Sequence, residues 1–485
     1  MPRSENLVGA VLILGGGIGG IQAALDLAES GFKVYLAEKS PAIGGTMPML
    51  DKTFPTNDCS MCILSPKLVE CGRHRNIEVL TRAEVVDFRG GPGSFTATVK
   101  KHPRYVDPAR CLSCGSCAEV CPVEVPDAFN QRLGTRKAIY KPYPQAFPNA
   151  YVVDRENCLE CMACVEACPV DAIDHGMTEE IVEIRAGAVI VNPGFALFDP
   201  RRRGEFGFGE CANVLTSLQF ERMLSASGPF GGHLKRPSDG AVPKKIAFLQ
   251  CVGSRDAARG QGYCSAVCCM HAAKEAIVAK EHEPGLDAAV FFIDVRSSGK
   301  DFEKYYRRAK EEYGVRYVRC AVSAVKELQK TKNLRLRYRD GGGRVREEDF
   351  DLVVLSAGMK PSPEAVETAQ RLGLELDSYG FCRVPPFSGV ASFRPGVFVA
   401  GAFAGPKDIP ETVMQASAAA GEAAALLAPA KNTLVAAKEL PPPPPSGRWE
   451  QKSRVSGFLC ATAGTTSAAW WTFRRWWRRR PGCPA

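Results

Sequence analysis

The chain has 485 residues, enough for about three domains of roughly 150 residues each. Apolar residues make up 45% and charged residues 24%, which excludes a disordered or fibrous chain. A net charge of +9 alone would suggest an acidic partner, but residues 446–485 hold eight Lys or Arg against one Glu. The rest of the chain is therefore nearly neutral, at +2, and we expect no nucleic-acid partner.

Cysteine is the second compositional signal, with 20 residues. A secreted disulfide protein is usually much shorter, and the first ten residues hold no apolar signal core. No run of about 18 apolar residues occurs, so we expect no membrane span. The composition predicts a cytoplasmic chain whose thiols bind metal or carry out redox chemistry.

The chain begins with the pattern of a dinucleotide-binding unit. Residues 9–14 read as a buried strand, a helical pattern runs to about residue 30, and a second strand over residues 33–37 ends at Glu38. Between the first strand and the helix stand three glycines at G-x-G-x-x-G spacing, Gly15, Gly17 and Gly20. These glycines let a pyrophosphate approach the helix N-terminus, and the acid can bind ribose hydroxyls.

Two further segments favour FAD over NAD. Gly44-Gly45-Thr46 follows the second strand, as in flavoproteins with two dinucleotide domains. Residues 396–402 form a strand that ends in small residues, among them Gly401, and in such flavoproteins the equivalent segment returns to contact the flavin. Ala402 replaces the usual Asp there, so that one contact is not expected.

The cysteines between residues 111 and 168 repeat the bacterial ferredoxin spacing C-x2-C-x2-C-x3-C-P. A zinc ribbon needs two cysteine pairs, so two quartets with trailing proline favour two [4Fe–4S] clusters. Because the fourth cysteine of each run ligates the other cluster, the spacing predicts crosswise sets. One set is Cys111, Cys114, Cys117 and Cys168; the other is Cys158, Cys161, Cys164 and Cys121.

A second dinucleotide domain is expected after residue 242, and its first strand covers residues 245–250. No glycine fingerprint follows that strand, so we do not expect NAD(P)H binding. Four cysteines stand there instead, and they are either ligands of a further cluster or buried thiols near a helix start. They are Cys251, Cys264, Cys268 and Cys269.

The catalytic residues are unknown from sequence, but Cys59 and Cys62, with Cys71 nearby, stand where disulfide reductases carry a redox disulfide. Three interpretations stay open: a flavin-facing thiol pair, ligands of a cluster near the flavin, or structural thiols. The remaining thiols before residue 440 are expected to be ordinary core or surface residues, and the histidines to be structural. These are Cys211, Cys320 and Cys382, and His74, His102, His175, His233, His271 and His282.

Taken together, these segments resemble the A-subunit family of heterodisulfide reductases (HdrA) and the related flavoprotein component of a quinone-interacting membrane-bound oxidoreductase. The likeness covers residues 8–432, including PAIGGTMPMLDKTFPTNDCSMCILSPK, QCVGSRDAARGQGYCSAVCCMHAAKEA and AGPKDIPETVMQASAAAGEAA. The resemblance implies a thioredoxin-reductase-like FAD module that exchanges electrons with clusters and partner subunits, and that in several members bifurcates electron pairs. It matches Gly15, Gly17, Gly20, Glu38, Gly45 and Gly401 to FAD contacts, the eight ferredoxin cysteines to cluster ligands, and Cys251–Cys269 to at least one more cluster.

We therefore expect an α/β oxidoreductase with a pair of Rossmann-type domains and an inserted 2[4Fe–4S] ferredoxin domain. Its expected partners are B- and C-like subunits and a ferredoxin or another electron carrier, in a hetero-oligomer. The alternative is a stand-alone NAD(P)H-dependent reductase of the glutamate synthase small-subunit type, which predicts a second glycine fingerprint. The expected parts are FAD-binding residues 1–104, 179–242 and 359–432, a ferredoxin insert at 105–178, a second Rossmann-like domain at 243–358, and a tail at 433–485.

The tail reads differently from the rest of the chain. Five prolines at 441–445 favour a stiff spacer, and four of the five tryptophans follow it without any helical or strand pattern, which predicts disorder. When residues 461–480 are back-translated with GC-rich codons, another frame reads HCGNNIGGVVDVPAVVEAA after Cys460. That string resembles a Cys-His-Cys-Gly module of the same family, so we expect a frameshift near Cys460 that truncates a longer protein.

Overall fold

The computed structural model describes residues 7–436, and the polyproline segment and the expected frameshift lie outside the described residues. Its first layer is a five-stranded parallel sheet in the order β22-β11-β1-β2-β3. Every residue of the central strand β1 is buried, as expected for a strand covered on both faces. The strands are β1 (Ala10–Leu14), β2 (Lys33–Glu38), β3 (Ile77–Thr81), β11 (Ala188–Val191) and β22 (Val397–Val399).

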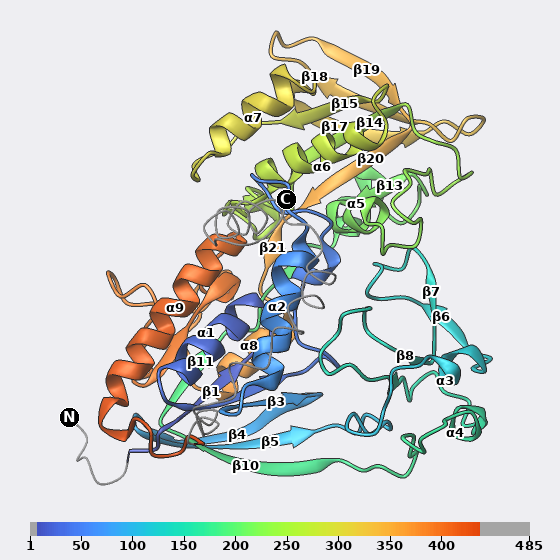
Figure 1. The fold of residues 1–485 in the computed structure, drawn as a ribbon. Coiled ribbons are helices and arrows are strands. Elements are labelled where there is room, and N and C mark those ends of the chain that lie inside the picture. Colours follow the sequence, from blue (N-terminus) through green and yellow to red (C-terminus); the bar gives the residue numbers. More distant parts are fainter. Residues whose placement is uncertain (1–6, 437–485) are drawn as a thin grey trace, which may run out of the picture. The chain divides into compact units, whose positions relative to one another are not determined.

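Each face of this sheet has its own cover (Figure 1). Three helices bury one face, α1 (Ile18–Glu29), α2 (Ser60–Arg73) and α9 (Ile409–Leu426). The other face carries an antiparallel meander and α8 (Pro363–Arg371). The meander strands are β4 (Ala83–Gly91), β5 (Ser94–Lys101) and β10 (Glu180–Ala186).

A second parallel sheet repeats this architecture, in the order β13-β20-β14-β15-β16. Helices α5 (Ser217–Leu224), α6 (Cys268–His282) and α7 (Phe302–Glu311) pack on one face, and a second meander covers the other. Its strands are β13 (Val214–Thr216), β14 (Lys245–Val252), β15 (Asp287–Phe292), β16 (Arg316–Arg319) and β20 (Leu352–Ala357), with the meander β17 (Ala321–Glu327), β18 (Leu334–Arg339) and β19 (Val345–Phe350).

This topology corrects one expected boundary. Strand β13 and helix α5 fall inside residues 179–242, which were expected to belong to the FAD-binding domain, but β13 pairs with β20 of the second sheet. The chain crosses between the sheets after β11 and again after β20. The two crossings pair with each other as the short strands β12 (Ala196–Leu197) and β21 (Met359–Lys360).

The cysteine-rich segment is an insertion between two neighbouring strands of the first meander. Lys101 at the end of β5 pairs with Glu180 at the start of β10, so the chain leaves and returns at one point. The insert has its own small core, and its regular elements are short. They are α3 (Ser116–Glu119), α4 (Ala163–Glu166), β6 (Glu124–Pro126), β7 (Thr135–Lys137), β8 (Ile139–Tyr140) and β9 (Val152–Val153).

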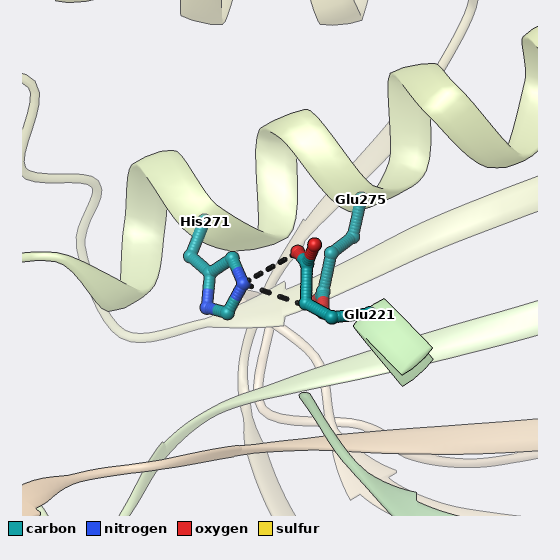
Figure 2. Close-up of side chains that lie close together, drawn as sticks. All are labelled: Glu221, His271 and Glu275. Carbon is teal, nitrogen blue, oxygen red and sulfur yellow. Dashed lines mark hydrogen bonds and ion pairs between the residues drawn. The ribbon is translucent and has the colours of Figure 1, made fainter. Parts of the chain in front are cut away.

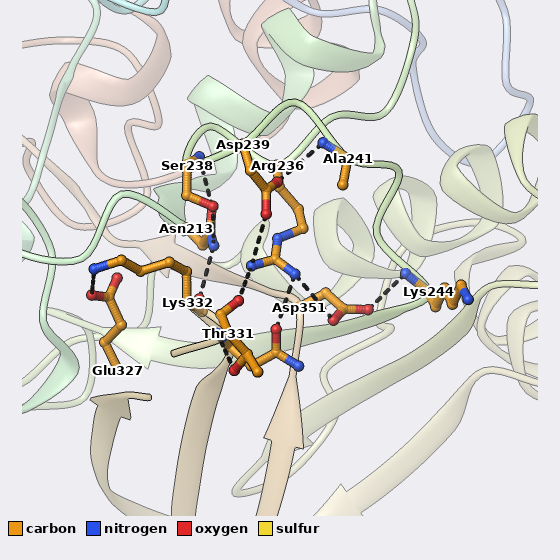
Figure 3. Close-up of polar contacts among 11 residues, drawn as sticks. Asn213, Arg236, Ser238, Asp239, Ala241, Lys244, Glu327, Thr331, Lys332 and Asp351 are labelled. Carbon is orange, nitrogen blue, oxygen red and sulfur yellow. Dashed lines mark hydrogen bonds and ion pairs between the residues drawn. The ribbon is translucent and has the colours of Figure 1, made fainter. Parts of the chain in front are cut away.

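A buried arginine fastens the segment between α5 and β14 to the second sheet (Figure 3). Arg236 donates to the Asn333 side chain at 2.9 Å and to the Thr331 carbonyl at 2.6 Å, and its guanidinium lies 3.6 Å from Asp351. Asp351 in turn accepts the backbone N–H groups of Lys244 and Lys245. This network fixes where β14 begins, and β14 carries the first of the four later cysteines.

Candidate functional site

The glycine loop after β1 adopts the tight turn that the spacing predicts. Gly15 has a φ of +102°, and its N–H donates to Ala37 O at 2.8 Å. A Cβ on Gly20 would lie 1.9 Å from Gly15 O, so the helix approaches the strand as closely as glycine alone allows. Gly17 is the N-cap of α1, and its N-cap position leaves the helix N-terminus open toward a pyrophosphate.

The other predicted FAD residues gather at this loop. The Glu38 carboxylate accepts the Gly16 N–H at 2.6 Å and the Ser40 N–H at 2.8 Å, which holds the acid at the end of β2. Gly44 N–H donates to Gly16 O at 2.7 Å, and a Cβ on Gly45 would lie 3.0 Å from Gly17 Cα. The two glycine turns thus form one cradle, in which an added side chain would occupy the space of a dinucleotide.

Two polar residues that belong to no sequence motif complete this cradle. The Asn192 amide at the end of β11 accepts Gly20 N–H at 2.7 Å and donates to Ala400 O at 3.0 Å, so it joins the loop to the return segment. Lys407 donates to Gly401 O at 2.9 Å and Gly405 O at 2.7 Å, and burial lowers its pKa. Gly401 therefore lies beside the first glycine loop, as the family resemblance implies.

The ferredoxin insert contains two hollows, and each is lined by one of the predicted crosswise sets. Cys111, Cys114, Cys117 and Cys168 line the first. Cys121, Cys158, Cys161 and Cys164 line the second. The fourth cysteine of each run thus faces the three cysteines of the other run.

The thiol spacing in these hollows fits a cluster better than a single ion. Four thiolates on one zinc ion lie about 4 Å from one another, because Zn–S bonds are about 2.3 Å long. Within residues 7–436, no three cysteine sulfurs lie within 4.8 Å of one another. Burial and the neighbouring thiols raise the pKa of Cys117 to about 12, and one of those neighbours is Cys164 from the other set. The two hollows are therefore adjacent, as electron transfer between them requires.

The third thiol group also comes together. Cys251 lies in β14 with a φ of +62°, while Cys268 and Cys269 open α6. Burial raises the pKa of Cys251 to about 11, and the nearby thiols Cys269 and Cys264 add to the effect. Neutral thiols in this setting are inert, so only a metal that displaces their protons would make them ligands.

The first thiol group divides into two parts. Cys59 is the N-cap of α2 and its sulfur accepts the Cys62 N–H at 3.3 Å, with both side chains exposed. Cys71 lies in the core beneath α1, where burial raises its pKa to about 12. Nine residues of helix separate Cys71 from Cys62, about 13 Å of rise, so the buried thiol does not join the exposed pair.

A buried ionic cluster lies between α5 and α6 (Figure 2). Glu221 accepts His271 Nε2 at 2.7 Å and the Asp51 N–H at 2.9 Å, and it also contacts Lys274 Nζ. Burial lowers the pKa of Lys274 to about 8 and raises that of Glu275 to about 7. Glu221, His271 and Glu275 have ligand atoms within 4.8 Å, but the ammonium of Lys274 already supplies the cation that Glu221 needs.

We expect Lys274→Met to destabilise the protein strongly, because it leaves the Glu221 carboxylate buried without its cation. The free energy of unfolding should fall by about 3 kcal/mol, measured from the denaturation midpoint. The control is Lys52→Met, since Lys52 pairs with Glu281 at 3.0 Å but both side chains are 30% exposed. That change should cost less than about 1 kcal/mol, and equal losses in the two variants would contradict this role of Lys274.

Three family models match the regions described above. A 4Fe-4S dicluster domain matches residues 110–173, which include all eight ferredoxin cysteines. An FAD dependent oxidoreductase model matches residues 10–53, and a pyridine nucleotide-disulphide oxidoreductase model matches residues 260–423. The prediction of FAD and [4Fe–4S] clusters as cofactors is confirmed at this level.

Curated relatives extend the match across the described chain. The second iron-sulfur A subunit of a CoB–CoM heterodisulfide reductase from Methanopyrus kandleri is 52% identical over 412 residues, 84% of this chain and 63% of the relative. Over these aligned residues the chain belongs to the A-subunit family of heterodisulfide reductases. The A subunit of a ferredoxin:CoB-CoM heterodisulfide reductase from Methanosarcina mazei is 42% identical over 414 residues, 84% of this chain and 52% of that relative.

The chain spans less than two thirds of the length of these two family members. Among solved structures, a Lactococcus lactis thioredoxin reductase matches with a TM-score of 0.48 and 13% identity, covering 86% of this chain and 99% of that one. Within residues 7–436, no helix is both long and apolar enough to cross a membrane.

Proposed function

We propose that this chain is the FAD- and iron–sulfur-containing subunit of a heterodisulfide-reductase-type oxidoreductase complex, in which it relays or bifurcates electrons. The observation that carries the proposal is the combination, in one chain, of the double glycine cradle and two four-cysteine hollows. FAD supplies two-electron and one-electron chemistry, whereas each cluster passes single electrons. Gly15, Gly17, Gly20, Glu38, Gly45 and Gly401 would hold the flavin nucleotide, and the eight ferredoxin cysteines would hold the clusters.

The second sheet supports a donor other than NAD(P)H. Three residues separate β1 from α1, but 15 residues separate β14 from α6. The helix N-terminus is therefore not held against the strand end, where a dinucleotide pyrophosphate would bind. The turn that follows β14 is also filled, because a Cβ on Gly253 would lie 2.0 Å from the Phe198 ring.

We propose that electrons reach the flavin from protein partners instead. The family members are named as A subunits of heterodisulfide reductases, so other subunits are implied. We propose B- and C-like subunits and a ferredoxin as the partners, with disulfide cleavage on a separate chain. Cys251, Cys264, Cys268 and Cys269 are proposed as ligands of one further cluster, because β14 and α6 bring all four thiols to one place.

Anaerobic reconstitution with FAD, iron and sulfide tests this assignment. The full chain should then contain one FAD and at least eight irons, and more than eight if the third thiol group holds a cluster. Iron would be measured by colorimetric assay and the cluster type by Mössbauer spectroscopy. A preparation that carries flavin but no [4Fe–4S] signal would contradict the proposal.

A further inference from the structure

The two cluster hollows are not equivalent, although the chain that forms them is repeated. The two cysteine runs are offset by 47 residues, and their backbone contacts match: Ser113 N–H donates to Cys111 Sγ at 3.4 Å, and Glu160 N–H donates to Cys158 Sγ at 3.4 Å. His175 breaks the repeat, because the corresponding position in the first run is Ala128.

His175 lines the second hollow beside one of its proposed ligands. The imidazole Nε2 lies 3.4 Å from Cys164 Sγ, and Nδ1 lies 3.2 Å from Arg155 Nη1. Tyr105 stacks on the ring at a centroid distance of 6.2 Å. Arg155 is held in turn by Glu160 at 2.8 Å. The ring is therefore fixed on both edges and on one face.

These contacts determine which nitrogen of the ring carries the proton. A guanidinium can only donate, so Nδ1 beside Arg155 must accept. The N–H of the neutral ring then lies on Nε2, which points at the sulfur of Cys164. A cysteine thiolate that ligates a cluster can only accept, so the two groups are complementary.

Such a donor acts on the reduction of the cluster. Reduction adds negative charge that spreads onto the ligand sulfurs, and an N–H aimed at a sulfur stabilises that charge. Hydrogen bonds to the sulfurs are among the factors that set cluster potentials. In the first hollow the side-chain donor is the Ser116 hydroxyl, 3.5 Å from Cys114 Sγ, without an arginine behind it.

We propose that His175, oriented by Arg155, hydrogen-bonds Cys164 and raises the reduction potential of the cluster held by Cys121, Cys158, Cys161 and Cys164. His175 is thus a positioning residue that makes one of the two clusters easier to reduce. The inference rests on the proposed ligand sets and adds to them an ordering of the electron path within the insert.

The test is an EPR-monitored redox titration of the anaerobically reconstituted full chain. The wild type should show two one-electron steps from the insert. In His175→Phe, one step should move to lower potential by about a tenfold change in the reduction equilibrium, or about 59 mV, while the other stays in place. His175→Gln, whose amide N–H can still donate, should recover part of the shift.

Met162→Leu is the matched control, since Met162 lines the same hollow without a hydrogen bond to sulfur and should leave both steps unchanged. If His175→Phe fails to hold the second cluster, Arg155→Gln decides the question, because it keeps the ring but frees Nδ1 and should lower the same step. Two intact clusters with unshifted potentials would overturn the role of His175 alone. A wild type with a single cluster would instead contradict the ligand sets.

Discussion

Gly17→Ala should lose tight FAD binding while the rest of the chain stays folded. A Cβ at Gly17 would meet only Gly45 Cα, at 4.0 Å, and its φ of −71° suits alanine, so the protein itself has room for the methyl group. The methyl group would instead fill the space at the helix N-terminus where the pyrophosphate approaches. We expect a cost of about 3 kcal/mol, or roughly 100-fold in the Kd for FAD.

The measurement is flavin absorbance per chain after purification, together with titration of the apoprotein and its thermal unfolding. Gly421→Ala is the control, because Gly421 lies on α9 with nothing within 4 Å of an added Cβ. Gly20→Ala should behave differently from both and lower apoprotein stability, because its Cβ would lie 1.9 Å from Gly15 O. Wild-type affinity in Gly17→Ala would show that FAD does not bind at this cradle.

Pairs of cysteine substitutions should reveal the crosswise ligand sets. Cys121 and Cys158 line the same hollow, so Cys121→Ala with Cys158→Ala should remove one cluster and leave the other. Cys168 lines the other hollow, so Cys168→Ala with Cys158→Ala should damage both clusters. The first pair should keep about half of the ferredoxin iron and the second pair little of it, because each cluster needs four thiolates.

Iron content and low-temperature EPR spectra of the two double variants, prepared in parallel, make this comparison. Cys320→Ala serves as a control for the loss of a thiol outside either hollow, and should keep the full iron content. If the two double variants lose equal amounts of iron, each run holds its own cluster and the crosswise assignment is wrong.

Much of this site could be predicted from the sequence because its signals are local. The loop with Gly15 and Gly20, the acid Glu38 and the doubled cysteine runs are each read within a few residues, and the structure places them as one cradle and two hollows. The place of Gly401 depended on the family resemblance, because its contact with the first loop spans nearly the whole chain.

Features that depend on distant partners were missed. Strand β13 has three residues, and nothing in Val214–Thr216 shows that it pairs with β20 and not with the first sheet. Asn192 and Lys274 are single residues whose roles come from contacts with other segments. His175 was expected to be structural, because its partner Cys164 is identified only once the second hollow is formed.

The central claim is that this flavoprotein takes electrons from iron–sulfur partners and not from a nicotinamide. Anaerobic stopped-flow measurement of the reconstituted full chain tests it directly, by following flavin absorbance after mixing with NADPH, NADH or reduced 2[4Fe–4S] ferredoxin. We predict rapid bleaching with reduced ferredoxin and none with either nicotinamide, because β14 and α6 lack the pyrophosphate turn. Rapid flavin reduction by NADPH or NADH would contradict this claim.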